Sequence, residues 1–144
     1  MSVSHTLTTS FLQDAINGTQ FDFSSSTSDI YNLALYTSSA ALSYATTAYS
    51  TTNEVSGTGY TAGGSALTIA TNPTVDGKVV YMTFSDFTFS SLTVSDIRYG
   101  LIYKADGSGN PSVSVIDFDA TYSPSAANFV VDMPTRLLKL MVGV

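Results

Sequence analysis

Short runs of β-branched and aromatic residues dominate the chain after residue 29, and turn-forming residues separate them. Eight of these runs have the length and composition of strands. They cover residues 30–36, 66–70, 78–84, 87–94, 97–104, 113–118, 129–132 and 137–142. Eight short strands of this kind predict an all-β fold, an antiparallel β-sandwich that we expect to be jelly-roll-like.

Apolar and polar residues alternate in several of these runs, as in strands with one buried face. In two of them the expected buried faces are formed by Val80, Met82 and Phe84 and by Leu138, Leu140 and Val142. Other runs are apolar on both faces, which predicts central strands that are covered on both sides.

Turn signals connect some of these runs. Asp76-Gly77 is a hairpin dipeptide, and the Gly- and Asn-rich segment 106–111 joins two further runs, so both junctions predict antiparallel neighbours. The alternation of Phe87 and Phe89 changes phase at residues 90–91, which fits a bulge or a strand that crosses between sheets.

One helix is expected near the N-terminus, over residues 10–17, with Ser10 as its cap, Gln13 as the capping-box partner and Gly18 as its stop. A helix this short needs a sheet or a neighbouring subunit to dock on. Its apolar face is formed by Phe11, Leu12, Ala15 and Ile16. We therefore divide the chain into an N-terminal arm, residues 1–20, with His5 in a mobile tail, and a single β-sandwich domain, residues 21–144.

The longest segment without a strand pattern covers residues 37–64. Its alanines leave a helix over residues 39–49 conceivable, but its Ser and Thr content favours a long ordered loop. Long loops in compact domains are often functional, so this loop is a candidate binding surface. A loop-shaping motif lies within it, in which glycines form turns and Glu54 accepts hydrogen bonds from their backbone. The motif residues are Glu54, Gly57, Gly59, Tyr60, Gly63 and Gly64.

Composition narrows the possible functions. The chain has 144 residues with 5 basic and 11 acidic side chains, a net charge of −6, and the basic residues are scattered, which argues against a nucleic-acid partner. There is no cysteine and one histidine, so disulfides, thiol chemistry, Cys-based zinc sites and Ser-His catalysis are disfavoured. Ser and Thr supply 42 residues, which predicts a neutral, hydroxyl-rich surface.

No apolar stretch is long enough for a membrane helix, and the N-terminus lacks the basic and apolar regions of a signal peptide. We therefore expect no membrane partner and synthesis in the cytoplasm. The glycosylation sequon at residues 17–19 is better interpreted as a helix-ending Asn-Gly.

Few residues suggest catalysis. Asp117 and Asp119 flank Phe118, so a strand would place both carboxylates on one face, where they could share a proton or hold a cation. A solvated pair at a strand end explains them better. The glycine-rich loop lacks the lysine of a phosphate-binding loop. We expect no catalytic, cofactor-binding or metal-binding residues and no enzymatic activity.

Contacts with other proteins are a better explanation of several residues. Tyrosine combines a large apolar ring with a polar tip, and the last nine residues are too apolar for a frayed terminus, so they must pack in a sheet or against a partner. The candidate interface residues are Phe11, Leu12, Ile16, Tyr44 and Tyr49.

Four segments resemble a family of small structural proteins of tailed bacteriophages. They are residues 34–40 (ALYTSSA), 53–64 (NEVSGTGYTAGG), 98–104 (RYGLIYK) and 115–118 (VIDF). In that family the strand ending in Asp-Phe is often followed by Gly, whereas Asp119 stands here, and residues 121–128 have no counterpart. The resemblance implies an all-β virion component without catalytic residues.

The expected function is therefore that of a non-enzymatic capsid decoration, or cement, protein. It would bind the major capsid protein on the outer surface of the head as a homo-oligomer, with a trimer expected from the habit of the family. Two alternatives stay open: a tail, neck or head-fibre component that contacts the host surface, and a carbohydrate-binding or carbohydrate-active domain that uses Asp117 and Asp119.

Overall fold

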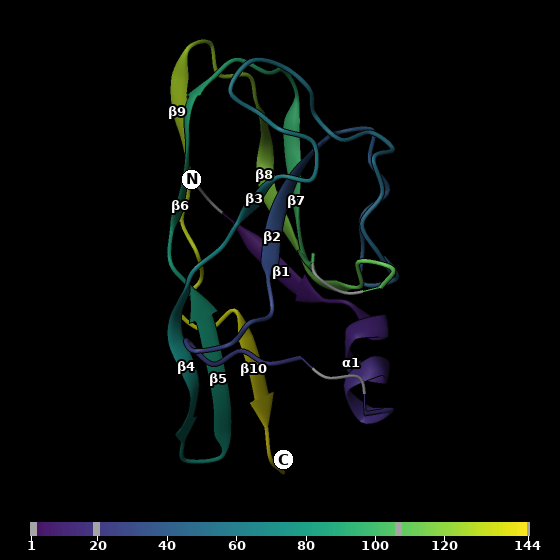
Figure 1. Cartoon of the computed structure of the whole chain (residues 1–144), viewed down its shortest axis with the longest axis vertical. Helices are drawn as coiled ribbons and strands as arrows, with labels where there is room; N and C mark the ends of the chain where they lie inside the picture. Colours follow the sequence, from purple (N-terminus) through teal and green to yellow (C-terminus); the bar gives the residue numbers. More distant parts are fainter. Residues whose placement is uncertain (1–2, 19–20, 106–107, 144) are drawn as a thin grey trace.

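A computed structural model describes residues 3–18, 21–105 and 108–143 of the chain. The described residues form ten strands and one short helix, arranged as in Figure 1. The elements are β1 (Ser4–Leu7), α1 (Thr9–Ile16), β2 (Tyr31–Thr37), β3 (Ser65–Ala66), β4 (Ile69–Asp76), β5 (Val79–Phe84), β6 (Phe87–Leu92), β7 (Ile97–Lys104), β8 (Ser112–Tyr122), β9 (Ala127–Val131) and β10 (Leu138–Met141). All strand pairs are antiparallel, which confirms the all-β fold with one short helix.

The strands form three sheets. The largest has the order β1-β8-β7-β2-β3, and the two smaller sheets are β10-β5-β4 and β6-β9. In Figure 1 the smaller sheets follow one another along one side of the large sheet, and the loop between β2 and β3 lies on its other side. The main core fills the space between the large sheet and the smaller ones; there, for example, the rings of Phe118 (β8) and Phe129 (β9) lie 5.4 Å apart.

The central strands of the large sheet are buried on both faces, as their apolar pattern predicts. Leu33 and Leu35 of β2 point into the main core, while Ala34 and Tyr36 join a second apolar cluster. Leu42 and Tyr49, from the loop over residues 38–64, pack on that second cluster. This part of the loop is therefore a third layer that shields the outer face of the sheet, whereas Val55 and Tyr60, later in the loop, pack in the main core. No helix forms in residues 38–64.

The turn predictions are confirmed. β4 and β5 form a hairpin around Gly77, and β7 and β8 pair as antiparallel neighbours. The pairing of β6 with β9 shifts register between Phe89 and Leu92, and Ser91 has a φ of 50°, so the phase change at residues 90–91 is a bulge.

The helix begins earlier than predicted. Its cap is Thr8, which has an extended backbone and whose Oγ accepts a hydrogen bond from the Phe11 amide at 3.3 Å. Ser10 lies inside the first turn and its hydroxyl bonds to the Thr46 carbonyl instead. Asn17 is the C-cap and Gly18 has a φ of 89°, as expected for a helix-ending Asn-Gly.

The expectation of a mobile tail around His5 is wrong, because Ser4–Leu7 form β1 at the edge of the large sheet and pair with β8. No apolar run marks this strand, because three of its four side chains are exposed. The single strand expected over residues 66–70 is also wrong. β3 ends at Ala66, and β4 runs through Pro73, which an edge strand tolerates where its register shifts.

Candidate functional site

The loop-shaping motif converges on the carboxylate of Glu54. Its Oε1 accepts hydrogen bonds from the Tyr60 hydroxyl at 2.6 Å and from the Gly63 amide at 2.7 Å, and its Oε2 accepts one from the Tyr49 hydroxyl at 2.7 Å. The Tyr60 oxygen in turn accepts the amide of Leu35 at 2.9 Å. The bond from the Gly63 amide is the backbone contact that the sequence predicts for Glu54, and the Tyr60 hydroxyl extends the link from Glu54 to β2.

The glycines of the motif let the loop approach neighbouring main chain. Gly64 has a φ of 75°, and a Cβ there would lie 1.8 Å from the Leu33 carbonyl oxygen. Gly57 and Gly59 lie similarly against the main chain of residues 90–93. The Gly63 carbonyl accepts hydrogen bonds from Tyr103 at 2.7 Å and from Asn32 at 3.2 Å. This network pairs the polar groups of the motif with one another and with the neighbouring strands.

The tyrosines differ in their surroundings. Burial, reinforced by the hydrogen bond to Glu54, raises the pKa of Tyr60 and of Tyr49 well above the ordinary value near 10. Tyr49 also stacks on Tyr103 of β7 with ring centroids 4.7 Å apart, so it packs against the large sheet. Tyr44 is 63% exposed and is the member of the predicted interface set from this loop that faces solvent.

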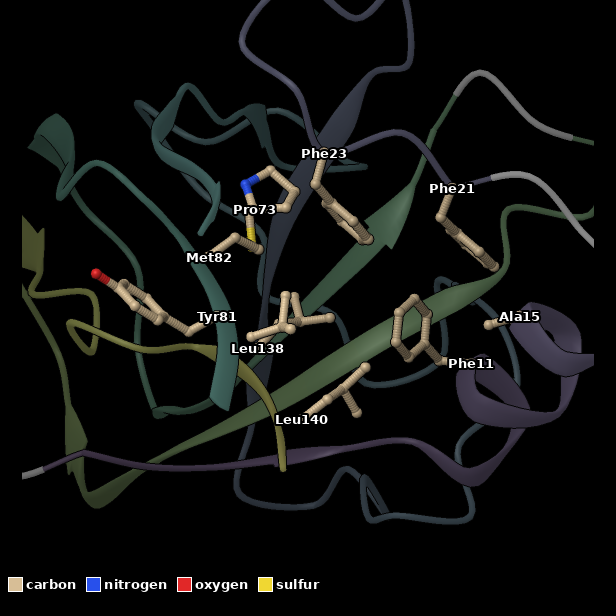
Figure 2. A pocket seen from close by; sticks show the side chains of 10 residues that line it. Phe11, Ala15, Phe21, Phe23, Pro73, Tyr81, Met82, Leu138 and Leu140 are labelled. Carbon is tan, nitrogen blue, oxygen red and sulfur yellow. The ribbon is translucent and has the colours of Figure 1, made fainter. Parts of the chain in front are cut away.

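A second region has the opposite character. An apolar hollow of about 340 Å³ lies between α1 and the β10-β5-β4 sheet (Figure 2). We call it the end groove. It is lined by Phe11, Ala15, Phe21, Phe23, Pro73, Val80, Tyr81, Met82, Leu138 and Leu140.

Aromatic rings form one wall of the end groove. Phe11 contacts Phe21 edge to face at 4.8 Å, and Phe23 stacks on Tyr31 at 4.7 Å. In Figure 2 the ring of Phe11 faces Leu138 and Leu140 of β10 across the hollow. Of these rings, Phe11 is the one that the sequence predicts as a candidate interface residue, on the expected helix. The contribution of Phe21 and Phe23 follows from no local pattern, because they lie in an irregular segment before β2.

The strand at the border of the groove exposes large apolar side chains. Leu140, Met141 and Val142 are 53%, 64% and 70% exposed. On the helix, Phe11 is buried but Leu12 and Ile16 are exposed, Ile16 by 86%, so the apolar face of the helix is only partly covered within the chain. Phe11 is the large apolar side chain through which the helix docks, and the other two candidate interface residues of the helix face solvent. The apolar C-terminal segment pairs in a sheet, as expected, yet its end stays uncovered.

Three of the five basic residues, Lys78, Arg136 and Lys139, lie on the β10-β5-β4 sheet or on the segments next to its strands, together with the acids Asp76, Asp86 and Asp132. Arg136 pairs with Asp76 and stacks on Tyr81 at 4.2 Å. Lys78 and Lys139 form no ion pair with any residue that the structure describes. Lys139 is therefore a positive charge on β10 that no described ion pair neutralises.

The acidic pair of the sequence analysis lies elsewhere, on β8. Asp117 forms an ion pair with Arg98, whose Nε is 2.9 Å from its Oδ1, and it accepts the Asp119 amide at 2.8 Å. Asp119 is exposed and has a φ of 64°. Asp117 lines a shallow hollow of about 280 Å³ together with Tyr44, Tyr99 and His5. Burial lowers the pKa of His5, which keeps its ring neutral at neutral pH.

No group of three metal-ligating side chains occurs within residues 3–18, 21–105 and 108–143. In the same ranges no helix is long and apolar enough to span a membrane. No protein-family model matches the chain, and no similar curated protein or solved structure is found.

Proposed function

We propose that the chain is a non-enzymatic structural protein of a bacteriophage particle, a capsid decoration protein that attaches to the outside of the head through its end groove. The observation behind this proposal is the combination of an aromatic-walled apolar groove with an exposed apolar strand end, residues 140–142, on a chain whose surface is otherwise rich in Ser and Thr. Contiguous exposed apolar surface of this kind marks protein interaction sites.

The placement of the resembling segments supports the assignment to phage structural proteins. Residues 34–37, 98–104 and 115–118 lie on the adjacent strands β2, β7 and β8, and residues 53–64 form the loop that packs on β2. The resemblance therefore covers one packed unit. At Asp119, where resembling proteins often have Gly, the backbone has the positive φ that glycine adopts readily.

The mechanism would be mechanical. Each copy would cover the joint between neighbouring subunits of the major capsid protein, and the added buried surface would oppose the pressure of the packaged DNA. Several weak footprints held in one oligomer, such as a trimer, would bind together with much higher avidity than a single one.

The test is co-sedimentation of the purified protein with particles that lack it, followed by antibody-gold labelling of complete virions. We expect wild type to bind and gold to spread over the head. Leu140→Asp should abolish binding, because the charge enters the groove. The matched control is Val130→Asp, at an apolar residue that is 41% exposed and belongs to β9 of the separate β6-β9 sheet, outside the lining of the groove. Absence of label from every particle would contradict the proposal.

A second candidate function is contact with host-surface saccharides from a tail, neck or fibre position. The observation that favours it is the hollow in which the exposed ring of Tyr44 and the ring of Tyr99 accompany the carboxylate of Asp117. Aromatic rings and hydrogen-bonding carboxylates together suit sugar binding. Gold label confined to the tail or to one vertex, together with cell binding that Tyr44→Ala abolishes, would favour this function over decoration.

A further inference from the structure

On its outer edge, β10 has no partner strand among the residues that the structure describes. β10 is the edge strand of the order β10-β5-β4, and Val142 continues its pairing by donating to the Lys78 carbonyl at 2.8 Å. In an antiparallel pair, the main-chain groups of alternate residues point toward the partner strand. Leu138, Leu140 and Val142 therefore bond toward β5, and the amides and carbonyls of Lys139 and Met141 point away from the sheet.

The end groove borders β10, because two side chains of this strand line it. Leu138 and Leu140 lie opposite Met82 and Val80, and all four line the groove, so this face of the sheet looks toward α1. Figure 2 shows the hollow continuing from Leu140 to Phe11. A further strand on the outer edge of β10 would direct every second side chain into this hollow.

The other face of the same sheet favours acidic side chains in an added strand. The side chains of Lys139 and Met141 alternate with those of Leu138 and Leu140, so they lie on the face away from the groove. An added strand would place its outward side chains beside Lys139, where acidic residues form favourable cross-strand pairs.

We infer that the outer edge of β10 binds an extended segment of a partner protein in which apolar and acidic residues alternate. The apolar side chains would fill the end groove and the acidic ones would face Lys139. This inference deepens the proposed attachment and rests on it, in that the segment would belong to the capsid subunit. Strand addition of this type takes its affinity from main-chain hydrogen bonds and its specificity from alternate side-chain pockets.

A second copy of the chain fits the edge less well. Pairing of two β10 strands would bring two Lys139 side chains to the same face of the joint sheet, and like charges on neighbouring strands are unfavourable. An acidic partner segment meets no such repulsion.

The test uses the full chain and a blocked octapeptide of alternating valine and glutamate, with an alternating valine and lysine peptide as its control. Binding is followed by amide chemical shifts in NMR titrations. We expect that only the acidic peptide binds and that the largest chemical-shift changes occur at the amides of Lys139, Met141 and Phe11.

Two variants separate the main-chain contribution from that of charge. Met141→Pro removes an amide that points outward and leaves the pairing with β5 intact, so peptide affinity should fall about ten-fold or more while the fold is retained. Lys139→Glu should lose the acidic peptide and gain the basic one. Proline at the opposite edge of the sheet, Val75→Pro in β4, is the control that should leave affinity unchanged.

Equal binding of both peptides, or full affinity in Met141→Pro, would overturn strand addition. Concentration-dependent dimerisation that Met141→Pro abolishes would instead identify a second copy as the occupant, which also overturns it. The proposed function fails separately: if wild type binds the acidic peptide but no particle, the edge is a binding site and the capsid is not its partner. If particle binding survives Met141→Pro, strand addition at β10 is overturned and the proposed attachment to the capsid stands.

Discussion

The loop over residues 38–64 and the end groove are both built around aromatic side chains, but they differ in how completely their groups are satisfied. In the loop, the carboxylate of Glu54 accepts three hydrogen bonds and the Tyr60 oxygen takes part in two. At the groove, apolar rings face a hollow, and the strand beside it has an unpaired edge. The difference indicates that the motif most conspicuous in the sequence maintains the fold, while the binding surface that we propose lies where the sequence pattern is least distinctive.

The largest expected effect is in the loop. Gly64→Ala should destabilise the protein by about 4 kcal/mol or more, because the new Cβ would collide with the Leu33 carbonyl of a buried strand. Gly77→Ala is the control: its φ is also positive but no atom lies within 4 Å, so only the backbone cost of about 1–2 kcal/mol applies. Urea denaturation measures both, and equal losses would show that steric contact at residue 64 is unimportant.

Glu54→Ala should cost about 3 kcal/mol, since it leaves the Tyr60 hydroxyl and the Gly63 amide without an acceptor. Glu54→Gln keeps one acceptor oxygen and should cost less. Thermal unfolding of the three proteins provides the comparison. If both variants unfold like wild type, the loop is held by packing on the sheet and not by its hydrogen bonds.

The buried tyrosines should make stability fall in alkali. The pKa of Tyr60 is raised in the folded protein by burial and by Glu54, whereas the unfolded chain ionises near pH 10. Above that pH the unfolded state binds fewer protons, so each such tyrosine lowers the free energy of unfolding by up to about 1.4 kcal/mol per pH unit until its folded pKa is reached. Denaturation curves between pH 8 and 11 should show this loss, and Tyr60→Phe should reduce its slope. An unchanged slope in Tyr60→Phe would assign the loss to other groups.

Sequence patterns predicted the parts of the fold that depend on local rules. The double-sided apolar runs became central strands, Asp76-Gly77 became a hairpin, and the glycines with Glu54 became an ordered loop. β1 escaped prediction because an exposed edge strand needs no apolar period. The end groove escaped because Phe21, Phe23 and β10 meet only through tertiary packing, and no local pattern encodes which residues meet across a fold. Leu12 and Ile16 share a helix face with Phe11 in sequence, yet docking buries just one side of that face.

The smallest expected loss of stability, that of Leu140→Ala, marks the border of the open region. Leu138 and Leu140 lie on the same face of β10, two residues apart, but they are 6% and 53% exposed. Leu138→Ala should cost about 2–4 kcal/mol because it leaves a cavity, whereas Leu140→Ala should cost about 1 kcal/mol or less because its side chain is already half in water. Urea denaturation compares the two directly. Particle binding should then show the reverse order, with the larger loss for Leu140→Ala, because the residue that contributes least to the fold would contribute most to the contact. A parallel loss of stability and binding in both variants would instead mean that the groove is an extension of the core, closed in solution by movement of α1 toward β10.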